Sequence, residues 1–217
     1  MPVVTKIVPQ KRRENRRNVY LDGKFAFGCN DNVIAKFRLR EGASLTAEQV
    51  RAVLEGEVRQ ECFDAALRAL ERRLHSREEL SRKLMRKEFG QTIIDGVLDE
   101  LIRLGYLNDE RFAKTRALAA AERKSHGKRR AMVELLKMGV KADVARRALE
   151  DVYDQHDTLA VARRLAEKQA PRLRKLDPLV ARRRLTGMLQ RRGFDHEDVR
   201  TVINDVLGQE TDRGEAD

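Results

Sequence analysis

Five apolar positions recur three times along the chain, and this internal repeat constrains the fold more than any single motif. Leu84, Leu135 and Leu189 are equivalent positions in the three copies. Four residues earlier stand Leu80, Ala131 and Leu185, and five residues later stand Phe89, Val140 and Phe194. Fourteen residues later stand Leu98, Leu149 and Ile203, and seventeen residues later stand Leu101, Val152 and Val206. All fifteen residues are apolar in a chain that is 41% hydrophobic. The spacings of 51 and 54 residues therefore predict three copies of one unit.

Each copy contains three segments with helical spacing and helix-capping signals. In the first copy Ser76 and Glu79 form a capping-box pattern, and in the third Asp177 precedes Pro178 as an N-cap followed by proline at the first helical position. A unit of about 50 residues buries little surface by itself, so we expect successive copies to support one another in an elongated array. The predicted division is a linker helix with repeat 1 over residues 46–108, repeat 2 over 109–156, repeat 3 over 157–207 and a disordered acidic tail over 208–217.

Residues 1–45 differ from the rest and predict a small β-containing unit, either a hairpin or three strands. The segments "VVTKIV", "NVYLDG" and "KFAFGC" are rich in β-branched and aromatic residues, and Asp22-Gly23 is a strong hairpin turn signal. The segment "NDNVIAKFRLREG" predicts a short helix that begins after Asn30 or Asp31 and ends at Gly42. A further capping box, Thr46 to Gln49, with Leu45 and Val50 as a hydrophobic staple, then begins the helical part.

The segment "LGYLNDERFA", residues 104–113, is interpreted as a joint between repeats 1 and 2. Gly105 would end one helix, with Tyr106 packing against Leu101, and Asn108 would cap the next helix. The predicted joint residues are Leu101, Gly105, Tyr106, Leu107, Asn108 and Phe112, the pair Leu107 and Phe112 forming a hydrophobic staple. A functional contact by Tyr106 is the alternative.

Composition narrows the classes of partner. The 217 residues carry a formal net charge of +11, which favours an acidic partner such as nucleic acid, an acidic protein surface or anionic lipid. The two cysteines, Cys29 and Cys62, are far apart and suit neither a disulfide framework nor a zinc site, and Cys62 fits a small core residue. No stretch approaches the roughly 18 apolar residues of a membrane span, and the N-terminus lacks a secretory pattern. We therefore expect a cytoplasmic protein.

The charge is concentrated in repeat 3. Residues 158–193 hold eleven Lys or Arg and two acidic residues, whereas residues 195–217 hold eight acidic and two basic residues. In the repeat frame Arg191 corresponds to Lys137 and Arg86, and Arg184 to Arg130, so each middle helix presents a cation at a shared outer position. The predicted partner or DNA contacts are Arg86, Arg130, Lys137, Arg163, Arg164, Arg172, Arg174, Lys175, Arg183, Arg184, Arg191 and Arg192. The alternative is a solubilising surface.

"KRRENRR", residues 11–17, is a second basic cluster, interpreted either as a hairpin loop that reaches phosphates or as a solvated loop.

Signals for catalysis are poor. The chain has no phosphate-binding glycine loop and no H-x-x-x-H spacing, and its four histidines are scattered at expected helix ends. Carboxylates mostly alternate with Lys and Arg at helical spacing, as on solvated faces. We expect no enzymatic activity, no cofactor and no metal.

The combination of "SREELSRKLMRKEFG", "LDELIRLGYLNDERFAKTRA" and "GKRRAMVELLKMGV", followed by a more divergent third unit, resembles the RecX family of RecA regulators. The resemblance covers about residues 60–207, and the N-terminal strands resemble the longer members. "LND" stands where an acidic pair is more usual in the family. The resemblance implies tandem three-helix repeats in an extended, curved arrangement. It also implies a cytosolic protein that binds RecA filaments on single-stranded DNA and restrains ATP hydrolysis, strand exchange and co-protease activity. The sequence gives no oligomeric state, and a monomer is the simpler expectation. A non-specific DNA-binding module or transcription regulator is the alternative, because three-helix units can resemble helix-turn-helix domains.

Overall fold

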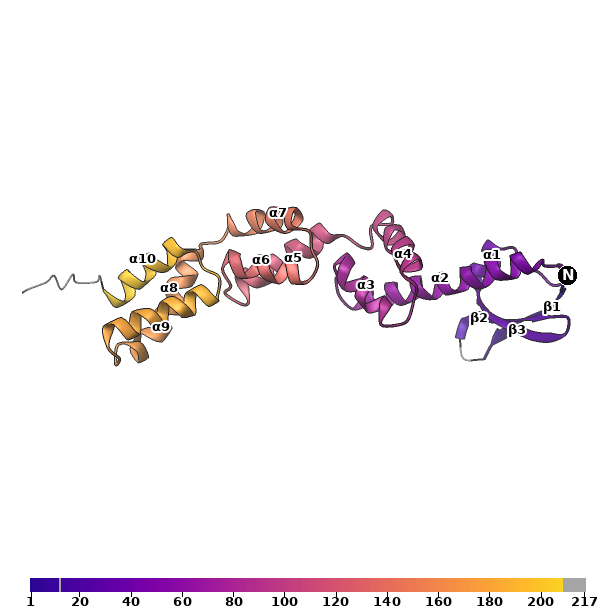
Figure 1. Cartoon of the computed structure of the whole chain (residues 1–217), viewed down its shortest axis with the longest axis horizontal. Coiled ribbons are helices and arrows are strands. Elements are labelled where there is room, and N and C mark those ends of the chain that lie inside the picture. Colours follow the sequence, from indigo (N-terminus) through magenta and orange to yellow (C-terminus); the bar gives the residue numbers. More distant parts are fainter. Residues whose placement is uncertain (12, 209–217) are drawn as a thin grey trace, which may run out of the picture. The chain divides into compact units, whose positions relative to one another are not determined.

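The computed structural model describes residues 1–11 and 13–208, and within them lie one three-stranded sheet and ten helices (Figure 1). The contacts divide the chain into two compact units. The first comprises residues 1–74 and 80–107, and the second comprises residues 75–79 and those from 108 onward. The predicted tail, apart from Gly208, lies outside the described residues, as does Arg12. A mainly helical fold with an N-terminal sheet is confirmed.

The N-terminal sheet is antiparallel, with strand order β1 (Val4–Gln10), β2 (Arg13–Leu21), β3 (Lys24–Asn30). Asp22 and Gly23 form the predicted tight turn between β2 and β3, and both have positive φ, 49° and 80°. The buried side chains of the sheet include Val4, Val19 and Phe27, which belong to one apolar core. The three-stranded form of the prediction is therefore the one that the structure confirms.

Helix α1 (Asp31–Lys36) is shorter than predicted, because it ends before Gly42. Its N-cap is Asn30, as expected, and the Asn30 side chain accepts a hydrogen bond from the Asn32 amide at 2.9 Å. At the other end Arg38 adopts φ 51°, and the Leu39 amide donates to the Ile34 carbonyl at 3.0 Å. This pattern is a Schellman ending without glycine, and it places Leu39 in the core at 7% exposure. The burial of Leu39 thus stops the helix where the sequence shows no glycine.

Helix α2 (Ala47–Arg72) joins the sheet to repeat 1 as one continuous helix, where the sequence suggested a linker helix and a separate first helix. It starts at the predicted capping box: the Thr46 hydroxyl accepts from the Gln49 amide at 3.1 Å, and the Gln49 side chain accepts from the Thr46 amide at 2.8 Å. Its N-terminal half contributes Val53 to the core of the sheet, and its C-terminal half contributes Cys62 and Ala66 to the core of repeat 1. One helix therefore belongs to both cores.

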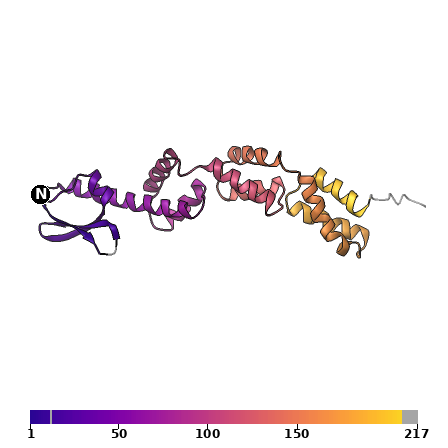
Figure 2. The same ribbon diagram turned by 180° about the vertical axis from the view of Figure 1, so that it is seen from behind.

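The three repeats form the expected helices. Repeat 1 continues with α3 (Arg77–Met85) and α4 (Gln91–Arg103). Repeat 2 contains α5 (Asp109–Glu122), α6 (Lys128–Lys137) and α7 (Ala142–Tyr153), and repeat 3 contains α8 (Thr158–Leu173), α9 (Pro178–Arg191) and α10 (His196–Leu207). In repeat 3, α10 packs against both α8 and α9 (Figure 1 and Figure 2). All the repeated apolar positions are buried except Phe89, which is partly buried against the core of repeat 1, so the repeat frame is confirmed.

The predicted joint after α4 has the expected helix ending but a different apolar contact. Gly105 has φ 76°, and the Tyr106 amide donates to the Leu101 carbonyl at 2.9 Å, which completes a Schellman motif. The residue that packs with Leu101 is Leu107, which is 2% exposed, whereas Tyr106 is 57% exposed. Asn108 caps α5 as predicted, accepting from the Arg111 amide at 2.8 Å. Leu107 and Phe112 belong to different units, so their staple stays a prediction.

Repeats 2 and 3 meet through backbone at two glycines. The Gly127 amide, at the start of α6, donates to the Arg192 carbonyl at 2.8 Å, and the Arg129 amide donates to the Gly193 carbonyl at 3.2 Å. A Cβ atom on Gly127 would lie 2.1 Å from the Gly193 carbonyl oxygen, and one on Gly193 would lie 2.3 Å from the Arg130 amide nitrogen. Because α6 has no side-chain cap, repeat 3 supplies acceptors for its first amide groups.

The same contact occurs once more within the second unit. Ser76, equivalent to Gly127, donates its hydroxyl to the carbonyl of Met138 at 2.5 Å, and Met138 is equivalent to Arg192. Repeat 3 differs, because α9 begins about one turn earlier than α6 in the repeat frame and is capped by its own Asp177. The Asp177 carboxylate accepts from the Leu179 amide at 2.9 Å, as the Asp177-Pro178 pattern predicted. The middle helix of repeat 3 is therefore capped by a side chain of its own repeat.

Candidate polyanion-binding surface

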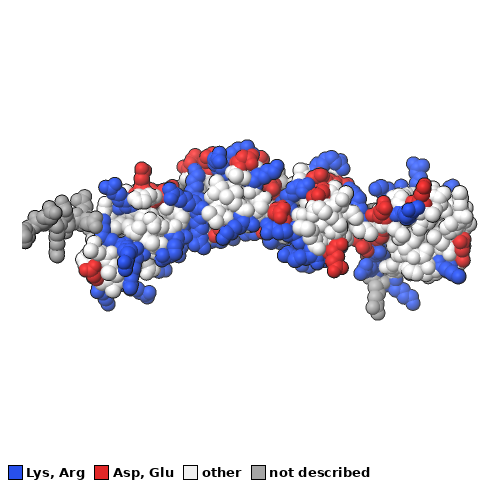
Figure 3. Space-filling model, in the orientation of Figure 1, with Lys and Arg blue, Asp and Glu red and all other residues white. Residues whose placement is uncertain are grey.

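Repeat 3 carries a group of exposed cations on α8, α9 and the turn between them. Figure 3, in the orientation of Figure 1, shows Lys and Arg side chains gathered over this repeat. Six of the predicted contact residues are exposed and, within the described part of the chain, have neither an ion pair nor a side-chain hydrogen bond: Arg164, Arg172, Lys175, Arg183, Arg184 and Arg191. We call these six residues the repeat 3 cation group.

Helix α9 holds three members of this group for a clear geometric reason. Ala181, Leu185 and Leu189 are at most 3% exposed, so the i, i+4, i+8 stripe packs in the core as predicted. Arg184 and Arg191 then lie seven residues apart on the outer side, about 10 Å along the helix axis. Gly187 lies between them, and the Arg191 guanidinium extends back over it, since a Cβ atom on Gly187 would be 3.0 Å from Arg191 Nη1. The outer side of α9 is therefore cationic, and no side chain projects from it at Gly187.

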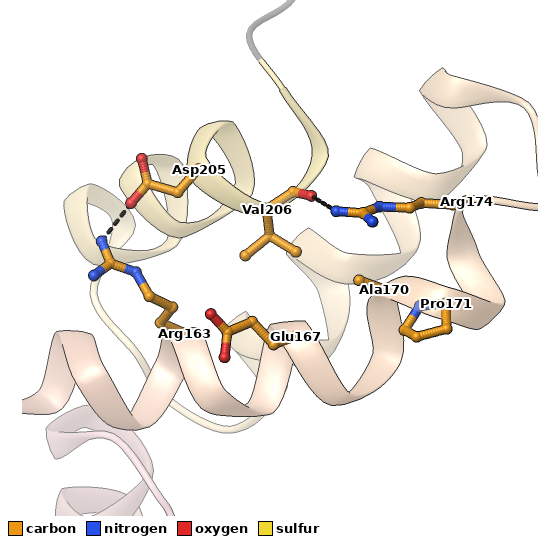
Figure 4. A pocket seen from close by; sticks show the side chains of 7 residues that line it. All are labelled: Arg163, Glu167, Ala170, Pro171, Arg174, Asp205 and Val206. Atoms are coloured by element: carbon orange, nitrogen blue, oxygen red, sulfur yellow. Dashed lines mark hydrogen bonds and ion pairs between the residues drawn. The ribbon is translucent and has the colours of Figure 1, made fainter.

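Two further predicted residues are held inside repeat 3. Arg163 pairs with Asp205, and Arg174 donates to the Val206 carbonyl at 2.9 Å, so both connect α8 or its end to α10 (Figure 4). Both side chains line a hollow of 530 Å³ together with Glu167, Ala170 and Pro171. Their guanidinium groups already have acceptors, so they contribute to the fold of the repeat as well as to its charge.

Arg130 and Arg192 lie at the joint between repeats 2 and 3. Arg130 Nη1 donates to the Arg191 carbonyl at 2.9 Å, and Arg192 Nη1 donates to the Lys124 carbonyl at 3.1 Å. Arg130 thus differs from its equivalent, Arg184, which has no such partner among the described residues. Both side chains are exposed, but in repeat 2 the shared position is hydrogen-bonded to the backbone of the next repeat.

The remaining predicted cations, Arg86 and Lys137, are exposed at the C-terminal ends of the middle helices. Arg86 follows the last residue of α3, and Lys137 is the last residue of α6. Both occupy the position of Arg191 in the repeat frame, and all three side chains are exposed. That they contact a partner stays a prediction.

Residues 13–17 of the basic segment form part of a strand, which corrects the prediction of a loop for them. Arg13 onward belongs to β2, in which Arg16 pairs with Asn30 and Arg17 with Cys29 of β3. Arg16 lies 2.9 Å from Glu57 and 2.6 Å from Glu61 on α2, and Arg17 lies 2.6 Å from Asp31. Two cations of the cluster, Arg16 and Arg17, are therefore held in ion pairs within the fold. The β-branched and aromatic residues that follow Arg17 were the signal for strand.

Near this segment lies a hollow that the sequence did not indicate. Its volume is 720 Å³, and Arg13, Arg16, Arg68 and Lys87 line it with the carboxylates Glu14, Glu61 and Asp64. These side chains come from β2, α2 and the turn after α3, and no repeat or motif brings them together in the sequence. The mixed charge makes it less suited to a polyanion than the repeat 3 cation group.

A titratable cluster supports the joint between repeats 2 and 3. His126 Nδ1 lies 3.2 Å from Glu134, which also binds Lys124 at 2.9 Å. Burial lowers the pKa of His126 below its ordinary value of 6.5. The negative charge of Glu134 acts to raise this pKa, whereas the positive charges of Arg130, Lys124 and Arg192 lower it further. Burial acts to raise the pKa of Glu134, but Lys124, His126 and Arg130 together lower it below its ordinary value. Burial raises the pKa of Tyr153 to about 12, and its hydroxyl donates to the His126 carbonyl at 2.7 Å.

Metal sites, membrane spans and reactive thiols are the other features to consider in the described residues. No group of three or more His, Cys, Asp or Glu side chains among them is arranged to hold a metal ion. Over the same residues, no helix has the length and apolar character needed to cross a bilayer. Burial raises the pKa of the thiols of Cys29 and Cys62 to about 12 and about 11, which keeps both protonated.

The fold and the repeat 3 cation group together define a class: a tandem three-helix-repeat protein that displays cations from its middle helices. Comparison with known proteins makes this specific. Residues 2–46 match the model of the regulatory protein RecX N-terminal domain, residues 62–101 the first three-helix domain of RecX and residues 156–203 the third. "Regulatory protein RecX" of Bacillus subtilis (strain 168) is 31% identical over 95% of this chain and 78% of its own length.

Two further similarities agree. "Regulatory protein RecX" of Clostridioides difficile (strain 630) is 28% identical over 95% of this chain and 97% of its own. A crystal structure of regulatory protein RecX superposes with a TM-score of 0.80 at 23% identity, over 94% of this chain and all of that one, which supports the fold. The chain therefore belongs to the RecX family of regulatory proteins.

Proposed function

We propose that this chain binds RecA filaments assembled on single-stranded DNA and restrains their ATP hydrolysis, strand exchange and co-protease activity. Its membership of a regulatory family supports the regulatory part of the proposal. The observation that carries the binding part is the repeat 3 cation group, six exposed Lys and Arg side chains without partners among the described residues. The resemblance of the repeats to the family of RecA regulators supplies the identity of the partner.

The physical basis of binding is electrostatic. Cations that neutralise phosphates release condensed counterions, so they give affinity that falls steeply with salt. Cations that contact an acidic groove on a partner protein also give affinity that falls with salt. They also raise the association rate by electrostatic steering. In this proposal the protein is not an enzyme and needs no cofactor. It acts in the cytoplasm as a monomer whose repeats hold neighbouring RecA protomers.

The direct test is RecA-catalysed, single-strand-dependent ATP hydrolysis with this protein titrated in. We expect the steady-state rate to fall at amounts below one molecule per RecA protomer. An unchanged rate, together with no sedimentation with filaments at moderate salt, contradicts the proposal.

The repeat 3 cation group is tested by Arg184→Glu combined with Arg191→Glu. We expect filament affinity to fall at least tenfold at low salt, and the slope of log affinity against log salt to become shallower, because phosphate or carboxylate contacts are lost. The matched control is Arg146→Glu with Arg200→Glu, which makes the same charge change at exposed residues of α7 and α10. Equal losses in both double variants would assign the effect to net charge alone.

The alternative, a DNA-binding module that acts without RecA, has a separate outcome. It predicts that affinity for single-stranded or duplex DNA equals affinity for the filament. Binding that strengthens when RecA and a nucleotide are added favours the proposed function instead.

A further inference from the structure

The middle helix of repeat 2 has an exposed apolar pair that the middle helix of repeat 3 lacks. On α6, Val133 is 50% exposed and Leu136 is 44% exposed. They are three residues apart, so their side chains are neighbours on the helix surface. Single exposed apolar residues are common on proteins, but two adjacent ones on a short helix with few other apolar surface residues need an explanation. We call Val133 and Leu136 the α6 outer pair.

Cations flank this pair. Lys137 follows Leu136 directly and is exposed. Arg129 lies one turn before Val133, is held at 2.9 Å from Asp195, and keeps 70% of its side chain exposed. The α6 surface therefore has an apolar centre and a positively charged edge, which complements a protein surface with an apolar centre and acidic residues around it.

The equivalent positions on α9 have different chemistry. Val133 corresponds to Gly187 and Leu136 to Gln190, and neither residue offers an apolar side chain. The Arg191 guanidinium lies over Gly187, and Arg183 and Arg184 are exposed on the same helix. The same position in the fold is thus apolar in repeat 2, whereas in repeat 3 it is uncharged and lies beside exposed arginines.

We propose that the two middle helices divide the binding between them: the α6 outer pair docks on the protein component of the filament, and α9 contacts phosphates. This inference rests on the proposed function, in which that protein component is RecA. Once docked, Val133 and Leu136 lose their remaining contact with water, which favours association. Phosphates and sugars offer no comparable apolar surface, and unstacked bases bind mainly to aromatic rings, which α6 does not have.

The test uses the full-length chain with Val133→Ala and Leu136→Gln, the second change copying the residue of repeat 3. Both positions are exposed, so we expect little loss of stability, which a thermal melt checks. The matched control is Leu118→Gln, the same change at a leucine of α5 that is 41% exposed in the same unit. Binding to single-stranded DNA alone and to RecA filaments on that DNA is measured at one salt concentration.

We expect the α6 variant to bind filaments at least tenfold more weakly and single-stranded DNA within about twofold of the unaltered protein. Leu118→Gln should change neither. Arg183→Gln with Arg184→Gln should show the opposite pattern, with the larger loss on DNA alone. The proposal is overturned if the α6 variant binds filaments normally, if it loses DNA and filament affinity equally, or if Leu118→Gln weakens filament binding as much. If the unaltered protein does not bind filaments, the proposed function itself fails.

Discussion

At the scale of single residues, the repeat frame identifies a strained position. Glu88 has φ 66°, and its equivalents, Gly139 and Gly193, have φ 78° and 83°. A side chain in the left-handed region costs about 1 kcal/mol relative to glycine. Repeat 1 therefore uses an unfavourable residue at a turn for which repeats 2 and 3 use glycine.

Glu88→Gly should raise the free energy of unfolding of the first unit by about 1 kcal/mol, because it relieves this strain. Gly139→Ala is the converse variant and should lower the stability of the second unit by a similar amount. Urea denaturation of each variant measures both effects. A loss of stability in Glu88→Gly would mean that contacts of the glutamate outweigh the strain.

His126 gives the second unit a dependence on pH. Its pKa is lowered in the folded protein, so the unfolded chain binds the proton more readily, and stability falls as the pH drops below the ordinary value of 6.5. Glu134 adds to this trend below its ordinary pKa of 4.5, since its pKa is lowered too. Thermal melts between pH 8 and pH 5 should show a falling midpoint.

The variant His126→Gln tests the assignment, because it removes the group that titrates near neutral pH. We expect its melting midpoint to change less than that of the unaltered protein between pH 7 and pH 5. An identical pH dependence in the two proteins would place the titrating group elsewhere.

At the scale of the elements, the repeats depend on each other for helix capping. The start of α6 takes carbonyl acceptors from the turn between α9 and α10, and the Ser76 hydroxyl binds the carbonyl of Met138 in the same way. A helix end that is buried without acceptors would lose about 1 to 3 kcal/mol per amide group. The joint thus contributes to stability while it orients the helix that carries the α6 outer pair.

Gly127→Ala should destabilise this joint by several kcal/mol, because the added Cβ atom would lie 2.1 Å from the Gly193 carbonyl oxygen. Gly96→Ala is the matched control: Gly96 lies within α4 with open space around it, and alanine there should raise stability by about 0.5 to 1 kcal/mol. Denaturation monitored by circular dichroism measures both. Equal effects would show that the close approach of the two glycines is not required.

At the scale of the whole molecule, the chain has two compact units, and α2 connects two cores within the first. Val19→Ala in the sheet should cost about 1 to 3 kcal/mol and, because α2 is continuous, should also increase amide hydrogen exchange in α4. Val202→Ala, a fully buried residue of repeat 3, should instead increase exchange in α8 to α10. Unchanged exchange in α4 after Val19→Ala would mean that α2 does not couple the two cores.

Much of this architecture was predictable because its signals are local or periodic. The apolar repeat identified the core of every copy, and Asn30, Thr46, Asn108 and Asp177 cap the helices that their positions indicated. Capping depends on a few adjacent residues and therefore reads directly from the sequence. The outward-facing positions of α9 were also predictable, because the burial of its i, i+4 stripe determines which residues of this helix face outward.

Other features depended on contacts between residues far apart in the chain. The burial of Leu39 sets the end of α1. Pairing within the sheet and ion pairs with α2 make residues 13–17 a strand. The carbonyl of Arg191 holds the Arg130 guanidinium in a hydrogen bond. Periodicity cannot distinguish an exposed arginine from one bound by the next repeat, because both lie on the outer side of their own helix. The sequence by itself determined the repeated helical plan and the excess of positive charge, since both follow from local pattern and composition. The tertiary structure decided which cations are free to bind within the described residues, because that depends on which acceptors the fold places beside them.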